Sequence, residues 1–154
     1  AGVLKPMLMD INVVNAPVVA KERGISVAET TRDDADAYDS IIRLRIITEQ
    51  QDRTISGTIF GSSPRIVEIK GVTMEASFAP HMLYTTNDDK PGFIGALGQT
   101  LGEAGLNIAT FNLGRSAPGE DAIALVAVDE PVSDAVLKKV SALPHVTQAK
   151  ALTF

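Results

Sequence analysis

The order of apolar patterns in the second half of the chain leaves few folds open to it. Strand patterns occupy four segments of this half: 81–86, 106–116, 122–128 and 146–154. Between the first two, apolar side chains recur at helical spacing: Ile94, Leu97, Leu101 and Ala104. Gly105 suits the end of that helix, while Ser133 suits the start of a second helix that Pro144 ends. The order β-α-β-β-α-β predicts a ferredoxin-like arrangement.

In such a fold, two helices cover one face of a four-stranded antiparallel sheet. The segment AIALVAV at 122–128 is apolar on both faces, which predicts a central strand. We expect the other face of the sheet, and its edge, to be available for pairing.

The first half is less regular and predicts a small antiparallel-sheet domain. Asn15 is a candidate N-cap for a short helix, APVVAKER at 16–23. Strand patterns follow at 25–31, 41–48, 53–60, 65–70 and 72–77, with an acidic loop at 32–40 and Gly71 as a tight turn. The fold class is therefore α+β. We expect two domains, 1–79 and 80–154, which meet near Pro80.

Composition narrows the function classes. The 154 residues include no cysteine, which excludes disulfides, thiolate metal sites and cysteine nucleophiles and fits a cytoplasmic protein. A net charge of −5 and an aromatic content of 5% argue against nucleic acid as a partner. Apolar runs are far shorter than the roughly 20 residues of a membrane helix, and residues 1–20 lack a signal-peptide pattern.

Polar residues lie just before the predicted helix at 93–104. Asn87 and Asp89 end the first strand, and Pro91 and Gly92 lead into a helix start whose N–H groups favour a carboxylate. Asn107 opens the next strand, which we expect beside the first. These groups match a free amino acid, which needs donors for its carboxylate and an acceptor for its ammonium. The alternative is that Asn87 and Asp89 only cap the turn and the helix.

Three glycines share a face of the same predicted helix: Gly95, Gly98 and Gly102. Glycine costs about 1 kcal/mol relative to alanine inside a helix. A face without side chains lets a second helix or a ligand come close. Tight packing of the helix on its own sheet is the alternative explanation.

Other candidate sites are weaker. The two histidines, His81 and His145, are too few and too separated for a zinc site. Ser62 and Ser63 lack the surroundings of a hydrolase nucleophile, so neither catalytic nor metal-binding residues are predicted. Basic residues concentrate in the first half: Arg43, Arg45, Arg53, Arg65 and Lys70. They suit a phosphorylated metabolite or a solvated strand face that balances the acidic loop.

Longer stretches resemble a known family. HMLYTTNDDKPGFIGALGQTLGEAGLNIATFNLGRS resembles the ACT domain of bacterial-type D-3-phosphoglycerate dehydrogenases, and EPVSDAVLKKVSALPHVTQAKAL resembles its closing helix and strand. VNAPVVAKERGISVAET and TISGTIFGSSPRIVEIKGVTMEA resemble the intervening domain before it, which is described as an allosteric substrate- or anion-binding domain.

The resemblance implies a regulatory and oligomerisation region with feedback control of serine biosynthesis. ACT domains of this family pair about a two-fold axis and bind L-serine at the interface. The matching residues here are Asn87, Asp89 and Asn107, with the backbone of Pro91, Gly92, Phe93 and Ile94. By the same resemblance, Arg65 and Lys70 are the candidate anion-binding residues of the intervening domain.

The chain lacks the family's Rossmann unit and catalytic residues, so the resemblance implies no hydride transfer by this chain alone. NAD is expected only in the absent catalytic domains. The opening strand and most of the first helix of the intervening domain are also expected before Ala1. Without that strand, the intervening sheet has an edge that invites pairing with another chain.

Three other functions remain open. The regulatory part of an iron–sulfur L-serine dehydratase also joins such a domain to an ACT domain, although the VNAP…KERGI stretch argues against it. The second alternative is an ACT domain that mediates assembly and binds no ligand. A small enzyme such as an acylphosphatase is a third, but no phosphate-cradling loop near an arginine is present.

Overall fold

The computed structural model describes residues 1–31, 38 and 40–154, so most of the predicted acidic loop at 32–40 lies outside the described residues. The chain divides into two compact units, Ala1–Ala35 and Asp36–Phe154.

The described residues of the first unit contain the helix α1 (Ala16–Glu22) and a small apolar cluster of Leu4, Ile11, Ala16 and Ala20. Asn15 lies at the predicted N-cap position, but its side chain does not cap the helix. Its backbone is already helical, and its side-chain oxygen accepts from the Asn12 N–H at 2.8 Å, so it closes the preceding turn instead. The predicted strand at 25–31 is also wrong: these residues are exposed and pair with no strand among the described residues.

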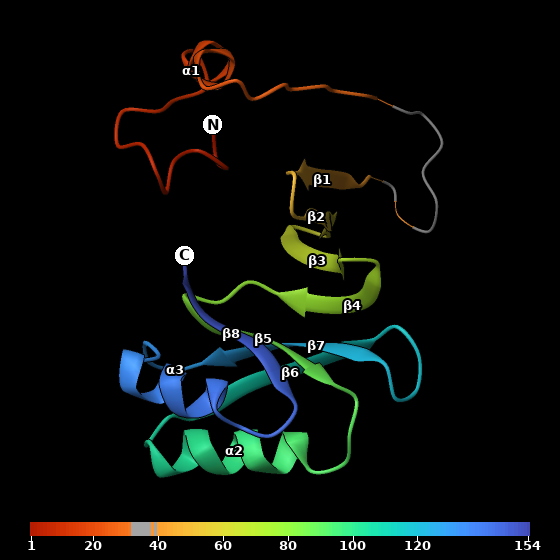
Figure 1. Ribbon diagram of the computed structural model, residues 1–154, viewed down its shortest axis with the longest axis vertical. Coiled ribbons are helices and arrows are strands. Elements are labelled where there is room, and N and C mark those ends of the chain that lie inside the picture. Colours follow the sequence, from red (N-terminus) through yellow and green to blue (C-terminus); the bar gives the residue numbers. More distant parts are fainter. Residues whose placement is uncertain (32–37, 39) are drawn as a thin grey trace. The chain divides into compact units, whose positions relative to one another are not determined.

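The second unit begins with an antiparallel sheet of four strands in the order β1-β2-β3-β4 (Figure 1). The strands are β1 (Ile42–Ile47), β2 (Asp52–Phe60), β3 (Ser63–Ile69) and β4 (Val72–Ser77). Ile69 pairs with Val72, so the predicted hairpin turn is present, but it contains Lys70 as well as Gly71. Both turn residues have positive φ, 52° and 81°, which is the geometry of a tight hairpin.

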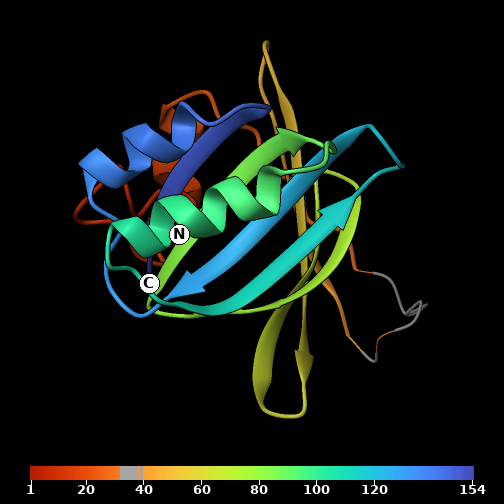
Figure 2. The same cartoon turned by 90° about the horizontal axis from the view of Figure 1, so that it is seen from below.

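The second sheet has the predicted ferredoxin-like order. Its strands are β5 (His81–Asp88), β6 (Ile108–Arg115), β7 (Asp121–Val128) and β8 (Val146–Thr153), and they pair as β6-β7-β5-β8. The helices are α2 (Phe93–Glu103) and α3 (Asp134–Ser141), which lie over one face of the sheet (Figure 2). The predicted cap of α3 is confirmed, because the Ser133 hydroxyl accepts from the Val136 N–H.

Apolar packing on both faces explains the continuous apolar run of β7. One face of the second sheet packs against the helices through Leu83 and Val126, where Leu97 and Leu101 of α2 are fully buried. The opposite face packs against the first sheet, mainly through Ile123 and Leu125. β7 lies between β5 and β6, so its predicted central position is confirmed.

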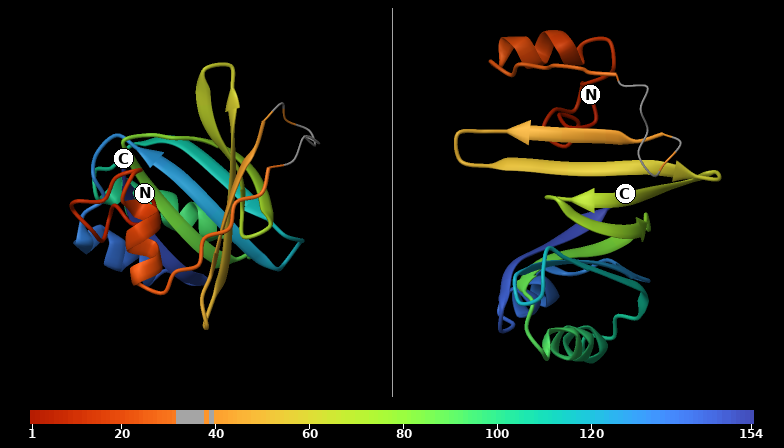
Figure 3. Two further views of the ribbon diagram at one scale, coloured as in Figure 1. Left: turned by 90° about the horizontal axis from the view of Figure 1, so that it is seen from above. Right: turned by 90° about the vertical axis from the view of Figure 1, so that its right-hand side faces the viewer.

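The expectation that the second face stays open is wrong, because β3 and β4 cover it (Figure 3, right). The two sheets come closest at Gly114 of β6. A Cβ at this position would lie 2.6 Å from the Thr73 carbonyl oxygen and 2.8 Å from Val72 Cγ1. Only glycine allows the backbones of β4 and β6 to meet in this way.

The expectation that the strand after Asn107 lies beside β5 is also wrong, since β7 separates the two. β5 and β6 are both antiparallel to β7, so they run parallel to each other. Their carboxyl ends therefore lie at the same end of the sheet, and Asn107 lies at the other end.

Candidate functional site

A pocket of about 350 Å³ lies at the carboxyl end of β5, where the chain turns into α2. It is lined by Asn87, Asp89, Lys90, Pro91, Gly92, Phe93, Ile94, Gly95, Leu113 and Arg115. Of the seven predicted serine ligands, Asn107 alone is missing from this set. The volume suits a small molecule.

Asn87 supplies the most unusual group in the pocket. The residue is only 2% exposed, and its side-chain nitrogen donates to the Asp88 carbonyl oxygen at 2.8 Å. Its side-chain oxygen is buried without a hydrogen-bond partner in the described part of the chain. A buried acceptor without a donor costs about 1–3 kcal/mol. The pocket therefore holds an acceptor that a ligand donor would satisfy.

Asp89 is held in place by two donors. Its carboxylate accepts from the Arg115 guanidinium at 2.9 Å and from the Gly119 N–H at 3.0 Å. The Gly119 hydrogen bond and then the Arg115 hydrogen bond lower the pKa of Asp89 below its usual value. Together they tie the turn after β5 to the end of β6 and to the loop before β7.

The lowered pKa gives a testable dependence of stability on pH. Because the folded pKa of Asp89 lies below the unfolded one, its stabilising contribution is complete above about pH 4 and is lost as pH falls through the folded pKa. We expect Asp89→Asn to lower the melting temperature at pH 7, and we expect this difference to shrink at pH 3. Thermal melts of both proteins across this range measure it. Glu130→Gln, at an exposed carboxylate, is the control.

The start of α2 provides donors. Gly92 precedes the helix with φ of 97°, and no side chain caps the helix at this position. The first N–H groups of a helix lack partners within it, and they carry the positive end of the helix dipole. A carboxylate at this end and an ammonium near Asn87 and Asp89 would match the charges of a free amino acid.

Asn107 does not join these residues within the chain. Its side-chain nitrogen donates to the Asp129 carboxylate at 2.7 Å, at the opposite end of β6 from the pocket. Arg115 and Leu113 instead reach the pocket from the carboxyl end of β6. The place of Arg115 in the pocket could have been predicted from the sequence. The first two strands of a split βαβ unit are parallel, so residues at their carboxyl ends lie at the same end of the sheet.

The predicted basic residues are distributed over separate sites. Arg43 and Arg45 pair with Glu68 and Asp52 on their own sheet, so this part of the basic strand face is balanced by carboxylates. Arg65 donates to the Ser77 hydroxyl and lines a mainly apolar groove. Lys70, at the other end of β3, lines a different pocket. Arg65 and Lys70 therefore do not converge on one anion.

The histidines are not part of a metal cluster. His145 lies 3.6 Å from the Asp88 carboxylate, and His81 begins β5. No group of three or more His, Cys, Asp or Glu side chains suited to a metal ion occurs in the described ranges. No helix within them has the length and apolar character needed to span a membrane.

Comparisons with known proteins agree with this architecture. A family model of the D-3-phosphoglycerate dehydrogenase intervening domain matches residues 1–70, and one of the ACT domain matches residues 81–145. D-3-phosphoglycerate dehydrogenases of Methanocaldococcus jannaschii and Bacillus subtilis are each 34% identical over 94% and 99% of the chain. That of Archaeoglobus fulgidus is 33% identical over 96%.

The chain spans 28–29% of the length of these relatives. Both family models and the relatives agree on one family, and the second sheet has the fold predicted for the ACT domain. The chain therefore consists of an intervening domain of the D-3-phosphoglycerate dehydrogenase family followed by an ACT domain.

Proposed function

We propose that this chain is the L-serine-binding, self-associating regulatory region of a cytoplasmic, NAD-dependent D-3-phosphoglycerate dehydrogenase, in which it gives feedback control of serine biosynthesis. Dehydrogenation and NAD binding belong to the parts of the relatives that this chain does not cover. The boundary near Pro80, between an intervening domain at 1–79 and an ACT domain at 80–154, is part of this proposal.

The observation that carries the proposal is the unpartnered, buried oxygen of Asn87 beside an uncapped helix start. L-Serine offers an ammonium donor for this oxygen and for Asp89, and a carboxylate acceptor for the first N–H groups of α2. Asp89 is already bonded to Arg115, so a bound ammonium would share its carboxylate.

Pairing of two copies explains how Asn107 contributes. β6 is an edge strand, and within the described residues it pairs only with β7. If two β6 edges pair antiparallel about a two-fold axis near Phe111, Asn107 of one copy lies opposite Arg115 of the other. Asn107 then completes the pocket of its partner.

The glycines of α2 support the same arrangement. A Cβ built on Gly95, Gly98 or Gly102 meets nothing within 4 Å, so these glycines are not explained by packing on their own sheet. Helices beside a paired β6 edge would meet along this smooth face. A serine molecule that contacts both copies stabilises the paired state only to the extent that it binds the paired state more tightly than the separate copies.

Calorimetric titration with L-serine tests the proposal, with D-serine and glycine as controls. We expect stereoselective binding with about one serine for each ACT domain, because each copy has one such pocket at the start of α2. Absence of heat with all three compounds, on a folded dimer, would reject amino-acid binding and leave an assembly module.

Asn107→Ala should weaken serine binding and leave folding intact. Loss of one hydrogen bond to a charged ligand costs about 1.5–3 kcal/mol, or roughly 10- to 100-fold in affinity. Calorimetry measures the affinity, and circular dichroism checks the fold. Unchanged affinity would remove Asn107 from the site.

A further inference from the structure

Strand β5 carries a second buried polar group beside the pocket at the start of α2. Thr85 is fully buried, and its hydroxyl has no hydrogen-bond partner within the described residues. The side-chain oxygen of Asn87, two positions further along β5, is in the same condition. Four buried side-chain polar atoms of the described chain lack a partner, and two of the four therefore lie next to each other on one strand.

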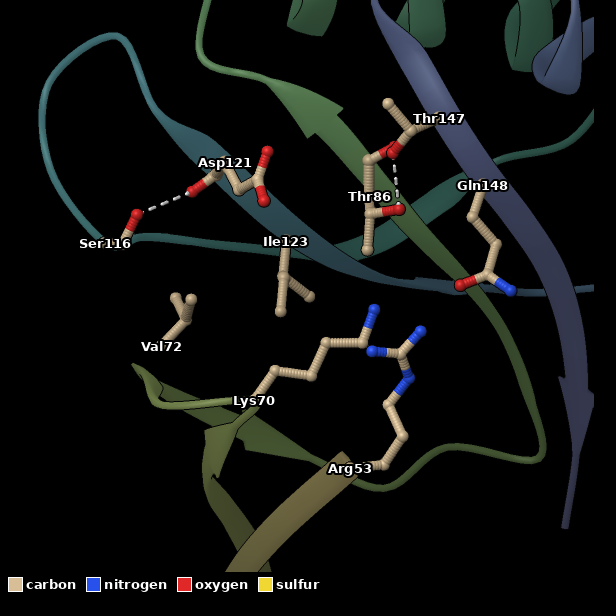
Figure 4. A pocket seen from close by; sticks show the side chains of 9 residues that line it. All are labelled: Arg53, Lys70, Val72, Thr86, Ser116, Asp121, Ile123, Thr147 and Gln148. Atoms are coloured by element: carbon tan, nitrogen blue, oxygen red, sulfur yellow. Dashed lines mark hydrogen bonds between the residues drawn. The ribbon is translucent and has the colours of Figure 1, made fainter. Parts of the chain in front are cut away.

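Thr85 and Asn87 point to the same side of the sheet, because side chains alternate along a strand. This is the side that the helices cover, since Thr85 pairs with Ala124 of β7, which belongs to the apolar cluster between the sheet and the helices. Thr86 points to the opposite side, where its hydroxyl lies 2.8 Å from that of Thr147 (Figure 4). One threonine hydroxyl thus has a partner, and its neighbour in the sequence has none among the described residues.

Folding alone does not explain the Thr85 hydroxyl. A buried hydroxyl without a partner destabilises the folded state, whereas a valine of the same shape would not. Threonine and valine are both β-branched and both favour strands, so strand propensity does not select threonine here. Neighbouring positions on this face are aliphatic, namely Leu83 of β5 and Val126 of β7. The hydroxyl is therefore available to a group that does not belong to the chain.

Small residues surround the two polar side chains. Thr85 lies between Ala124 of β7 and Ala149 of β8 in the sheet. Gly95 of α2, which has no side chain, lines the same pocket as Asn87. These residues leave more room beside Thr85 and Asn87 than larger aliphatic side chains would at the same positions.

The separation of Thr85 and Asn87 suits one bridging oxygen atom. Residues two apart in a strand lie about 6.6 Å from each other. Two O–H···O hydrogen bonds in series span about 5.5 Å. A ligand hydroxyl between the two residues can therefore donate to the Asn87 oxygen and accept from the Thr85 hydroxyl. Asn87 lines the pocket and Thr85 lies behind it, so the ligand hydroxyl enters this position from the pocket.

We propose that Thr85 and Asn87 bind the side-chain hydroxyl of the amino acid, and that Thr85 thereby selects serine over alanine. The inference rests on the proposed function, in which the ammonium lies near Asn87 and Asp89 and the carboxylate lies at the start of α2. An amide oxygen has two lone pairs, so Asn87 can accept from both the ammonium and the hydroxyl. The hydroxyl is then the third polar attachment of the ligand. Three attachments distinguish L-serine from D-serine, which would direct its hydroxyl away from Thr85.

Calorimetric titrations with L-serine and L-alanine measure this selection as the ratio of their dissociation constants. We expect the parent to bind L-serine at least about tenfold more tightly, because L-alanine leaves both polar groups without a partner. Thr85→Val should lower this ratio about three- to tenfold through weaker binding of serine, with little change for alanine. Valine removes the unpartnered hydroxyl, so this variant should fold at least as well as the parent. Thr85→Ser keeps a hydroxyl and should keep the ratio.

Thr86→Val is the matched control. It removes a hydroxyl from the opposite face of the same strand and should leave the ratio unchanged, although it loses the contact with Thr147. Equal binding of L-serine and L-alanine by the parent, or a ratio that Thr85→Val leaves unchanged, would overturn the inference and leave the amino-acid site in place. The second of these results is expected if a water molecule, and not the ligand, bridges Thr85 and Asn87. Absence of binding by the folded parent would reject the proposed function and this inference together.

Discussion

Gly114→Ala should lower the free energy of unfolding by about 1–3 kcal/mol, the usual cost of overpacking a filled interior. The added methyl group would lie 2.6 Å from the Thr73 carbonyl oxygen and 2.8 Å from Val72 Cγ1. The nearest atom belongs to the backbone of β4, so a side-chain rotation cannot relieve the contact. Urea denaturation followed by circular dichroism measures the change in the midpoint.

Gly98→Ala is the matched control, since it adds the same methyl group to a helix. A Cβ at Gly98 meets nothing within 4 Å, and alanine is favoured over glycine in a helix by about 1 kcal/mol. In the monomer, the two variants should therefore change stability in opposite directions. A midpoint for Gly114→Ala equal to that of the parent would contradict the close contact between β4 and β6.

Asn87→Leu should abolish most serine binding without loss of stability. Leucine keeps the branched shape of asparagine, although its two methyl groups are larger than the oxygen and nitrogen that they replace. It removes the buried oxygen that has no partner among the described residues, which costs about 1–3 kcal/mol in the ligand-free protein. The Asp88 carbonyl oxygen keeps a donor, because the Lys90 N–H reaches it at 2.8 Å. We expect a loss of serine affinity of about 10- to 100-fold and an unfolding free energy that is unchanged or higher.

Mixing this variant with Asn107→Ala tests whether the pocket is shared between copies. In a mixed dimer, the Asn107→Ala chain keeps Asn87, and its Asn87→Leu partner supplies Asn107, so one of the two pockets is complete. Tight binding should reappear after the chains are mixed and allowed to exchange. If binding stays weak in verified mixed dimers, Asn107 does not act across the interface.

Local patterns were enough to predict the ferredoxin-like half of the chain. The helical spacing of Leu97 and Leu101 and the apolar run of β7 each follow from burial on the observed faces. The errors lie where structure depends on distant partners. Residues 25–31 have a strand-like pattern but pair with no strand in the part of the chain that the structure describes. The covering of the second face by β3 and β4 has no periodic signature.

The candidate sites show the same limit. The turn from Asn87 to Ile94 is continuous in sequence, so its residues were found together and line one pocket. Thr85 gives no such signal, because only the packing of the helices on the sheet leaves its hydroxyl buried without a partner within the described residues. No periodicity distinguishes Thr85 from Thr86, whose hydroxyl has a partner in Thr147.

Gly114 also restricts how a movement can spread from the pocket at the start of α2. Its neighbours Leu113 and Arg115 line that pocket, while Gly114 itself touches the backbone of β4. β6 therefore cannot slide along its own axis without a clash against the first sheet. A ligand that moves the end of β6 must carry both sheets as one block, so in the dimer proposed above we expect a rigid-body rotation about the paired β6 edges.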